Sequence, residues 1–273
     1  MIGADEPWSA VIVPITLFLL YAASAWLMLR SVSSRRLEPY AWALSLGAIL
    51  AHSGAIIHLM RTVGPFSIGL LEAISLLAWT LAVLACLIAL ERRYRLLSAI
   101  LLWSAALGST ATGSGHKFRV DAVPAWELSA HILLSMAAAA LLFAAAVTAS
   151  LLVLLDRRLR ARRIARLSDL LPPMDVLEKV MFRLIGSGFA LLTLSLFTGF
   201  VFVTNLFEQH LVHKTVLSLM AWVVFAILLI GRVRYGWRGR FAVRLTLAGF
   251  ILLALAYFGS KFVLEDIFGR HWG

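Results

Sequence analysis

Long apolar runs alternate along the chain with short polar segments that are rich in arginine. The runs approach or exceed the ~20 residues that an α-helix needs to cross a bilayer. We therefore predict an all-α, polytopic membrane bundle of about eight transmembrane helices, at residues 9–29, 40–60, 67–90, 96–112, 126–155, 180–205, 213–231 and 241–263. The fifth run is longer than one crossing requires, so its last turns are expected to continue as helix beyond the membrane.

Arginine and lysine are concentrated in every second loop. The loops after the first, third, fifth and seventh runs hold RSVSSRR, RRYR, RRLRARRIAR and RVRYGWRGR, whereas the alternate loops hold Arg61, then Lys117 and Arg119, then Lys214. Basic residues in short loops remain on the cytoplasmic side of a membrane. This pattern predicts that both termini lie on the outer, periplasmic side of a bacterial inner (plasma) membrane.

The composition supports a single membrane domain over residues 1–273. Hydrophobic residues make up 62% of the chain and charged residues only 14%, which leaves too little polar surface for a separate soluble domain. A basic linker at 156–175, expected in the cytoplasm, separates five spans in 1–155 from three in 176–273. The net charge of +11 is spread over four short loops, so it indicates contact with the lipid bilayer and no nucleic-acid binding.

The chain has one cysteine, Cys86, inside the third predicted span. A single cysteine forms no internal disulfide, and the sequence contains no C-x-x-C-H haem-attachment motif and no cysteine cluster for iron–sulfur or zinc. Any cofactor therefore has to be held by other side chains.

The seven histidines all fall in the outer half of the predicted topology. His52 is the deepest, His58 lies near the outer end of the second span, and His131 lies about one turn inside the fifth. The other four are expected in or beside outer loops and the outer tail: His116, His210, His213 and His271. This one-sided placement predicts a site that opens away from the cytosol.

Two interpretations of the membrane-embedded histidines stay open. Imidazole is a good axial ligand for haem iron, so His131, His52 or both could hold a haem between helices. Alternatively, each imidazole makes an interhelical hydrogen bond to a serine or a carbonyl oxygen. Ser45 shares the helical face of His52, and Ser135 follows His131 by one turn, which indicates that both faces point inward.

Two further polar groups lie near the predicted outer surface. Glu72 could take up protons or orient a histidine, or it could form an ion pair with Arg61 across a short hairpin. Lys214, with Lys117 and Arg119, could neutralise the propionates of a haem, or it could be an ordinary interfacial lysine.

The C-terminal third of the sequence resembles the cytochrome c assembly family, which includes CcsA and shorter relatives of the HemX and YpjD types. The resemblance rests on MDVLEKVMFRLIGSGFALLTLSLFTGFVF, HKTVLSLMAWVVFAILLIGRVRYGWRGR and LAYFGSKFV, and it covers about residues 174–262. These stretches contain Lys214, Trp222 eight residues later, and the GWRGR box at 236–240. The eight-span layout is most similar to the YpjD type.

The resemblance implies a haem-handling protein and assigns several site residues. In WELSAHILLSMAAAALLFAAAV, His131 occupies the position of a haem-binding histidine, and His271 lies near the family's second outer histidine. Lys214 and Trp222 are then expected at the same haem b site. The tryptophan-rich segment of CcsA proteins is replaced here by EQHLVHK, in which Lys214 is retained.

We therefore expect a cytochrome c biogenesis factor that binds haem through His131, His52 and His271, with other membrane or assembly proteins as partners. No set of nucleophile and base is visible, so the chain is not expected to be an enzyme by itself. The alternatives are a structural or regulatory subunit without haem, or a small-solute transporter that uses Glu72 and His52 as a relay.

Overall fold

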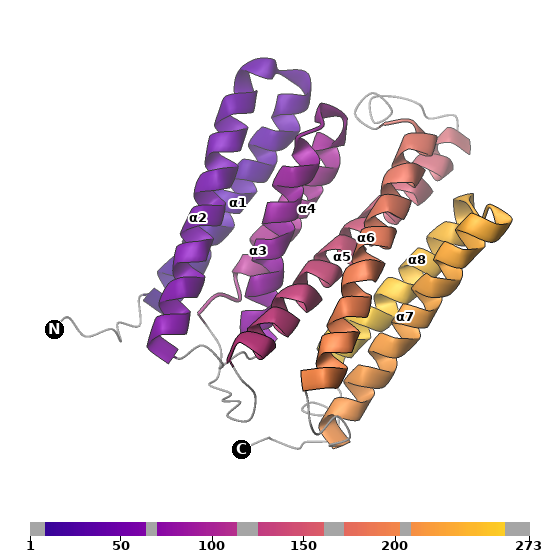
Figure 1. The fold of residues 1–273 in the computed structure, drawn as a ribbon. Helices are drawn as coiled ribbons and strands as arrows, with labels where there is room; N and C mark the ends of the chain where they lie inside the picture. Colours follow the sequence, from indigo (N-terminus) through magenta and orange to yellow (C-terminus); the bar gives the residue numbers. More distant parts are fainter. Residues whose placement is uncertain (1–8, 64–69, 114–124, 161–171, 203–208, 260–273) are drawn as a thin grey trace. The chain divides into compact units, whose positions relative to one another are not determined.

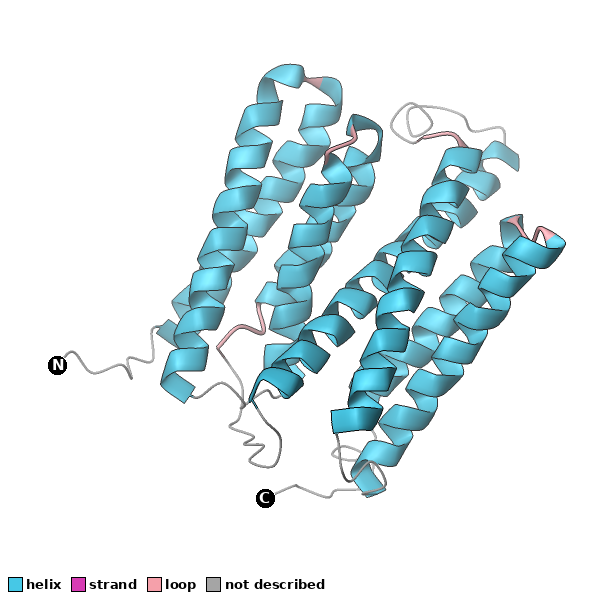
Figure 2. Ribbon diagram, viewed as in Figure 1, coloured by secondary structure: helices cyan, strands magenta, loops and turns pink. Residues whose placement is uncertain are grey.

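The computed structural model describes residues 9–63, 70–113, 125–160, 172–202 and 209–259, and every regular element in these ranges is helical (Figures 1 and 2). The elements are α1 (Ser9–Ser33), η1 (Arg35–Leu37), α2 (Glu38–Val63), α3 (Leu70–Ala89), η2 (Arg92–Tyr94), α4 (Arg95–Ser109), α5 (Ala125–Arg160), α6 (Met174–Phe202), α7 (Gln209–Tyr235), α8 (Gly239–Ala254) and η3 (Leu255–Gly259), a π-helical turn. The predicted all-α, polytopic membrane bundle is confirmed.

Seven of the described helices are long and apolar enough to cross a membrane: Val11–Ser33, Arg35–Arg61, Leu71–Ala89, Ser129–Arg160, Met174–Val201, Lys214–Tyr235 and Gly239–Tyr257. The predicted fourth span, 96–112, is shorter than expected. Helix α4 has 15 residues, about 22 Å at 1.5 Å per residue, and ends at Ser109 in tight turns through Thr112.

Helix α5 continues beyond one crossing, and helix α6 begins directly after a proline. Helix α5 extends for 36 residues to Arg160, which confirms that the fifth run continues as helix beyond one crossing. Helix α6 begins at Met174, directly after Pro173, with Asp175 in its first turn. Proline fits the start of a helix because its missing N–H would have no partner there, and an acidic side chain favours the positive helix end.

The described helices form two compact units that divide between Ala125 and Trp126. Unit 1 contains α1–α4 and unit 2 contains α5–α8. The single membrane domain, with its division at the linker 156–175, stays a prediction. The two compact units group the fifth helix with the last three. In unit 2, α5 contacts α8 through Phe143 and Phe250, whose ring centroids are 5.5 Å apart.

In unit 1, α4 packs against both α1 and α3. A Cβ added at Gly108 would lie 2.8 Å from the Cβ of Ala78, so glycine permits a close approach of α4 to α3. The largest fully buried side chains of this unit are Tyr21, Met28, Leu97, Leu101 and Leu102. This packing buries α4 even though the helix is short.

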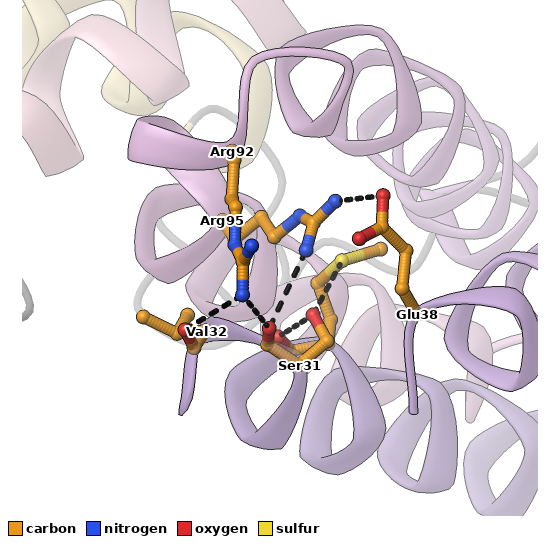
Figure 3. Close-up of polar contacts among 6 residues, drawn as sticks. Ser31, Val32, Glu38, Arg92 and Arg95 are labelled. Atoms are coloured by element: carbon orange, nitrogen blue, oxygen red, sulfur yellow. Dashed lines mark hydrogen bonds and ion pairs between the residues drawn. The ribbon is translucent and has the colours of Figure 1, made fainter. Parts of the chain in front are cut away.

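A buried arginine joins the two hairpins of unit 1 (Figure 3). The side chain of Arg95 is only 3% exposed, pairs with Glu38 at the start of α2 and donates to the carbonyl oxygen of Ser31 at 3.4 Å. Arg92 donates to the carbonyl oxygens of Ser31 and Val32 at 3.4 and 3.3 Å. The last carbonyls of a helix lack intrahelical partners and carry partial negative charge, so these arginines satisfy the end of α1.

The GWRGR box forms a second cluster of ion pairs in unit 2, which we call the arginine clasp: Asp156, Glu178, Arg232, Arg238 and Arg240. Glu178 of α6 accepts from Arg232 at 3.0 Å and lies 3.5 Å from Arg238. Asp156 near the end of α5 accepts from Arg240 of α8 at 2.8 Å. The clasp therefore connects all four helices of unit 2 at one end.

Two glycines with positive φ and one backbone hydrogen bond shape the turn between α7 and α8. Gly236 and Gly239 have φ of +66° and +62°, a conformation that favours glycine. The N–H of Trp237 donates to the carbonyl oxygen of Gly231 at 3.2 Å, and a Cβ at Gly231 would overlap the indole ring. The glycines of this segment therefore have backbone and packing roles.

Candidate functional site: two histidines among hydroxyl groups

Helices α5 and α6 approach closely because small residues line their contact. A Cβ added at Gly188 would lie 2.8 Å from Cγ of Leu142, so only glycine fits there without movement. Alanines 138–140 and 144–146 of α5 are buried. This close contact brings the polar side chains near the start of α5 against those near the end of α6.

His131 lies in this contact and is held by α6. Its Nδ1 lies 3.1 Å from Oγ1 of Thr198, and the hydroxyl of Thr198 donates to the carbonyl oxygen of Ser195 at 3.0 Å. The ring is partly exposed. Through Nδ1, His131 thus makes the interhelical hydrogen bond that was the second interpretation of the sequence.

Two serines fix the backbone beside this ring. Ser135 donates to the carbonyl oxygen of His131 at 2.7 Å, and its Oγ lies 2.6 Å from Oγ of Ser195. Both serines are only 5% exposed. The sequence identified Ser135 but missed Ser195 and Thr198, although their three-residue spacing places them on one face of α6.

His52 is the centre of a fully buried cluster in unit 1, which we call the His52 cluster: Tyr21, His52, Ser75 and Thr112. Its Nδ1 lies 3.1 Å from the Tyr21 hydroxyl, and its Nε2 lies 2.9 Å from Oγ of Ser75. Thr112 Oγ1 lies 2.7 Å from Ser75 Oγ and 3.4 Å from the same imidazole nitrogen. The four residues come from α1, α2, α3 and the turn after α4, so one imidazole joins the whole unit.

Both ring nitrogens of His52 therefore have protein partners, and the ring is 0% exposed. This arrangement is the hydrogen-bonding role that the sequence left open. Iron ligation by His52 stays a prediction, and it would require Ser75 and Thr112 to release Nε2. His52 and His131 belong to different units, and each is described within its own unit.

Glu72 lies one turn before Ser75 on α3. Its Oε2 is buried and has no hydrogen-bond partner among the described residues. The alternative of an ion pair with Arg61 is not observed between these two described side chains. Farther along α3, Trp79 donates to Oγ of Ser53 at 2.9 Å. Ser75 and Trp79 of this helix therefore both face α2.

The remaining candidates lie apart from these clusters or outside the described residues. Trp222 donates to Oγ1 of Thr193 at 2.9 Å and stacks on Phe189 with ring centroids 5.4 Å apart, so it joins α7 to α6. Lys214 is exposed near the start of α7. His271 lies outside the described residues, and its role, like those of Lys214 and Trp222, stays a prediction.

No group of three or more His, Cys, Asp or Glu side chains that could hold a metal ion occurs within the ranges that the structure describes. Among the described side chains, His52 of unit 1 and His131 of unit 2 each lie among hydroxyl groups instead. Such a donor set does not form an all-protein zinc or non-haem iron site, which needs three or four protein ligands. It is compatible with a cofactor such as haem that takes only one or two axial ligands.

Comparison with known proteins agrees with this picture. The family described as Cytochrome C assembly protein matches residues 67–268. Inner membrane protein YpjD of Escherichia coli (strain K12) is 41% identical over 137 residues, which cover 50% of this chain and 52% of the relative. Cytochrome c biogenesis protein CcsA of Gloeobacter violaceus is 30% identical over 100 residues, which cover 36% of this chain and 30% of the relative.

A longer match is an uncharacterised 28.8 kDa protein of Azospirillum brasilense, which is 33% identical over 238 residues, or 85% of this chain and 82% of the relative. The chain spans about half the length of the YpjD relatives that it matches. No solved structure matches the chain.

The fold and the two histidine clusters define a multi-pass helical membrane protein with embedded imidazoles, and the localisation expected for it, the inner membrane, is confirmed. The chain belongs to the cytochrome c assembly protein family. The resemblance inferred from residues 174–262 is therefore confirmed, and the family match begins well before that segment.

Proposed function

We propose that this protein handles haem during cytochrome c assembly, with His131 as an axial ligand of a haem b iron through Nε2. The observation that carries the proposal is the hydrogen bond of Nδ1 to Thr198, at 3.1 Å. A histidine that binds a metal through one nitrogen characteristically bonds a protein group through the other. The ring is partly exposed, so Nε2 is a reasonable point of approach for a ligand at this end of α5.

The residues around His131 fit such a group. Small side chains and hydroxyls surround the ring, and no carboxylate forms an ion pair with it within the described ranges. When bound, haem supplies an iron that an imidazole can coordinate and a strong visible absorbance. The role of the protein is to hold the His131 imidazole in place and to keep Nε2 available for a ligand.

Other candidate residues enter as finer parts of the same proposal. His271 would supply the second axial ligand, Lys214 would neutralise a propionate, and Trp222 would contribute an aromatic face. Iron ligation by His52 is a separate candidate within unit 1, and it requires exchange of the bond to Ser75, at 2.9 Å, for a bond to iron. His131 is therefore the first ligand to test.

Visible spectra of the detergent-purified protein, titrated with haem in oxidised and reduced states, test the proposal. We expect His131→Ala to weaken haem binding at least about tenfold and to change the position of the absorbance bands, because an axial ligand is lost. His58→Ala, on an exposed histidine of α2, is the matched control and should behave as the wild type. Identical titrations of His131→Ala and the wild type would refute His131 as the ligand.

A second function, a structural or regulatory subunit without haem, is favoured by the His52 cluster. Both nitrogens of its imidazole are used to join helices, as that function predicts. A wild-type protein that stays free of haem throughout the titration, yet loses stability on His52→Ala, would support this alternative. Co-purification partners of the intact membrane protein would then identify its complex.

A further inference from the structure

The hydroxyl of Thr198 takes part in two hydrogen bonds at once. It donates to the carbonyl oxygen of Ser195 at 3.0 Å, and its oxygen lies 3.1 Å from Nδ1 of His131. A hydroxyl has one hydrogen and two lone pairs, and the Ser195 carbonyl can only accept. The hydrogen between Thr198 and His131 must therefore come from the imidazole.

This count of hydrogens fixes the tautomer of the neutral ring. With its proton on Nδ1, the imidazole has its lone pair on Nε2. The same reasoning orients the serines: the hydrogen of Ser135 is used on the carbonyl oxygen of His131, so Ser195 donates to Ser135. The hydroxyl hydrogens of Thr198, Ser135 and Ser195 are then assigned, and these contacts join α5 to α6.

Gly199, the next residue on α6, sets the position of the ring. An ideal Cβ at this position would lie 3.0 Å from Cε1, 3.5 Å from Nδ1 and 3.8 Å from Nε2 of His131. At 3.0 Å, the imidazole has to move by a few tenths of an ångström to make room for an added methyl group. Glycine therefore allows the imidazole to lie directly against the backbone of α6.

We propose that Thr198 and Gly199 are positioning residues for His131: Thr198 holds the proton on Nδ1, and Gly199 sets the plane of the ring, so that Nε2 is presented as the ligand. This inference deepens the proposed function and rests on it for the part that concerns haem. The tautomer itself is a property of the protein without haem, and it can be tested separately.

The first experiment measures the tautomer without haem. The full-length, detergent-solubilised protein is labelled with ¹⁵N-histidine, and the ring nitrogens of His131 are assigned by comparison with His131→Ala. We expect a protonated Nδ1 in the wild type and in Thr198→Ser, which keeps the hydroxyl, and a shift toward protonated Nε2 in Thr198→Val, which removes it. A wild-type ring protonated on Nε2 would overturn the tautomer assignment, and a Thr198→Val spectrum equal to that of the wild type would overturn the role of Thr198.

The second experiment measures haem binding by the same variants. We expect Thr198→Val to weaken binding about tenfold, the lower end of the effect of removing a partner of a metal-binding histidine, while Thr198→Ser stays within about threefold of the wild type. Gly199→Ala should shift the absorbance bands and weaken binding. Gly186→Ala, with nothing within 4 Å of the added Cβ, is the matched control on the same helix.

The two experiments separate the two ideas. If His131→Ala abolishes the haem spectrum but Thr198→Val and Gly199→Ala bind as the wild type does, the positioning roles are refuted and the proposed function stands. If His131→Ala binds haem normally, the proposed function fails, and the NMR comparison alone decides whether Thr198 fixes the tautomer. A normal ring-nitrogen spectrum in Gly199→Ala together with a changed haem spectrum would support the separate role of Gly199 in ring position.

Discussion

At the scale of single residues, the two histidines that lie among hydroxyl groups have different environments. His52 is completely buried with partners at both nitrogens, and His131 is partly exposed with Nδ1 bonded to Thr198. Burying a polar group costs free energy unless it is hydrogen-bonded, so the His52 cluster has to be complete to be stable. The sequence predicted an outer-half position for both residues and could not separate their roles.

Tyr21→Phe tests the structural role of the His52 cluster. The substitution keeps the ring and removes one buried hydrogen bond, to Nδ1 of His52, so we expect a loss of about 1 kcal/mol in the free energy of unfolding. Thermal or denaturant unfolding in detergent measures it. Tyr40→Phe, on a tyrosine that is 65% exposed, is the matched control and should have little effect. Equal stability of both variants would show that the Tyr21 bond does not contribute.

At the scale of elements, close helix packing depends on glycine at defined positions of α6. Gly186 and Gly188 are two residues apart, but only Gly188 faces α5, where its added Cβ would meet Leu142. In membranes, association of helices depends strongly on such small residues because there is little hydrophobic driving force between them. The spacing of these glycines in the sequence does not show which of them provides the close contact.

Gly188→Ala should therefore destabilise unit 2, by about 1–3 kcal/mol, because the added methyl group forces α5 and α6 apart. Gly186→Ala should be neutral or slightly stabilising, since alanine has the higher helix propensity and the position is open. Unfolding of the two variants under identical detergent conditions makes the comparison. A Gly188→Ala protein as stable as Gly186→Ala would contradict the close contact.

The arginine clasp gives a second prediction at this scale. Glu178 accepts from Arg232 at 3.0 Å and from the N–H of Gly239 at 3.3 Å, and its side chain is only 14% exposed. Glu178→Gln removes the charge but keeps the shape, and we expect a loss of about 1–2 kcal/mol. Lys179→Gln, at the exposed neighbouring position of α6, is the control in the same unfolding assay. No difference between the two would exclude a stabilising role for this carboxylate.

At the scale of the whole molecule, the arrangement within each unit agrees with the alternating arginine-rich loops. In unit 1, Arg92 and Arg95 lie in the turn between α3 and α4 and contact the end of α1 and the start of α2. The arginine-rich turns α1–α2 and α3–α4 therefore lie at the same end of this unit. In unit 2, the clasp brings the ends of α5 and α7 to the starts of α6 and α8. Each unit therefore has one strongly basic end, as the rule for cytoplasmic loops requires.

Orientation in the membrane remains a prediction that cysteine labelling can test. In a Cys86→Ala background, single cysteines replace Arg36 in the first turn and Thr110 after α4, both exposed. A membrane-impermeant maleimide should label Thr110→Cys in spheroplasts and Arg36→Cys only after lysis, because arginine-rich turns are expected in the cytoplasm. The opposite pattern of labelling would invert the predicted topology.

The sequence alone determined the helical class, the approximate ends of the helices, the membrane location and the family, because hydrophobic run length, proline, charge and motifs are local properties. Only the tertiary structure decided which side chains meet, because an interhelical contact depends on how two helices are rotated and aligned. His52 reaches Ser75 across 23 residues of sequence, and His131 reaches Thr198 across 67. No local pattern carries that information, which is why Tyr21, Thr198 and Gly199 were found only in the folded protein.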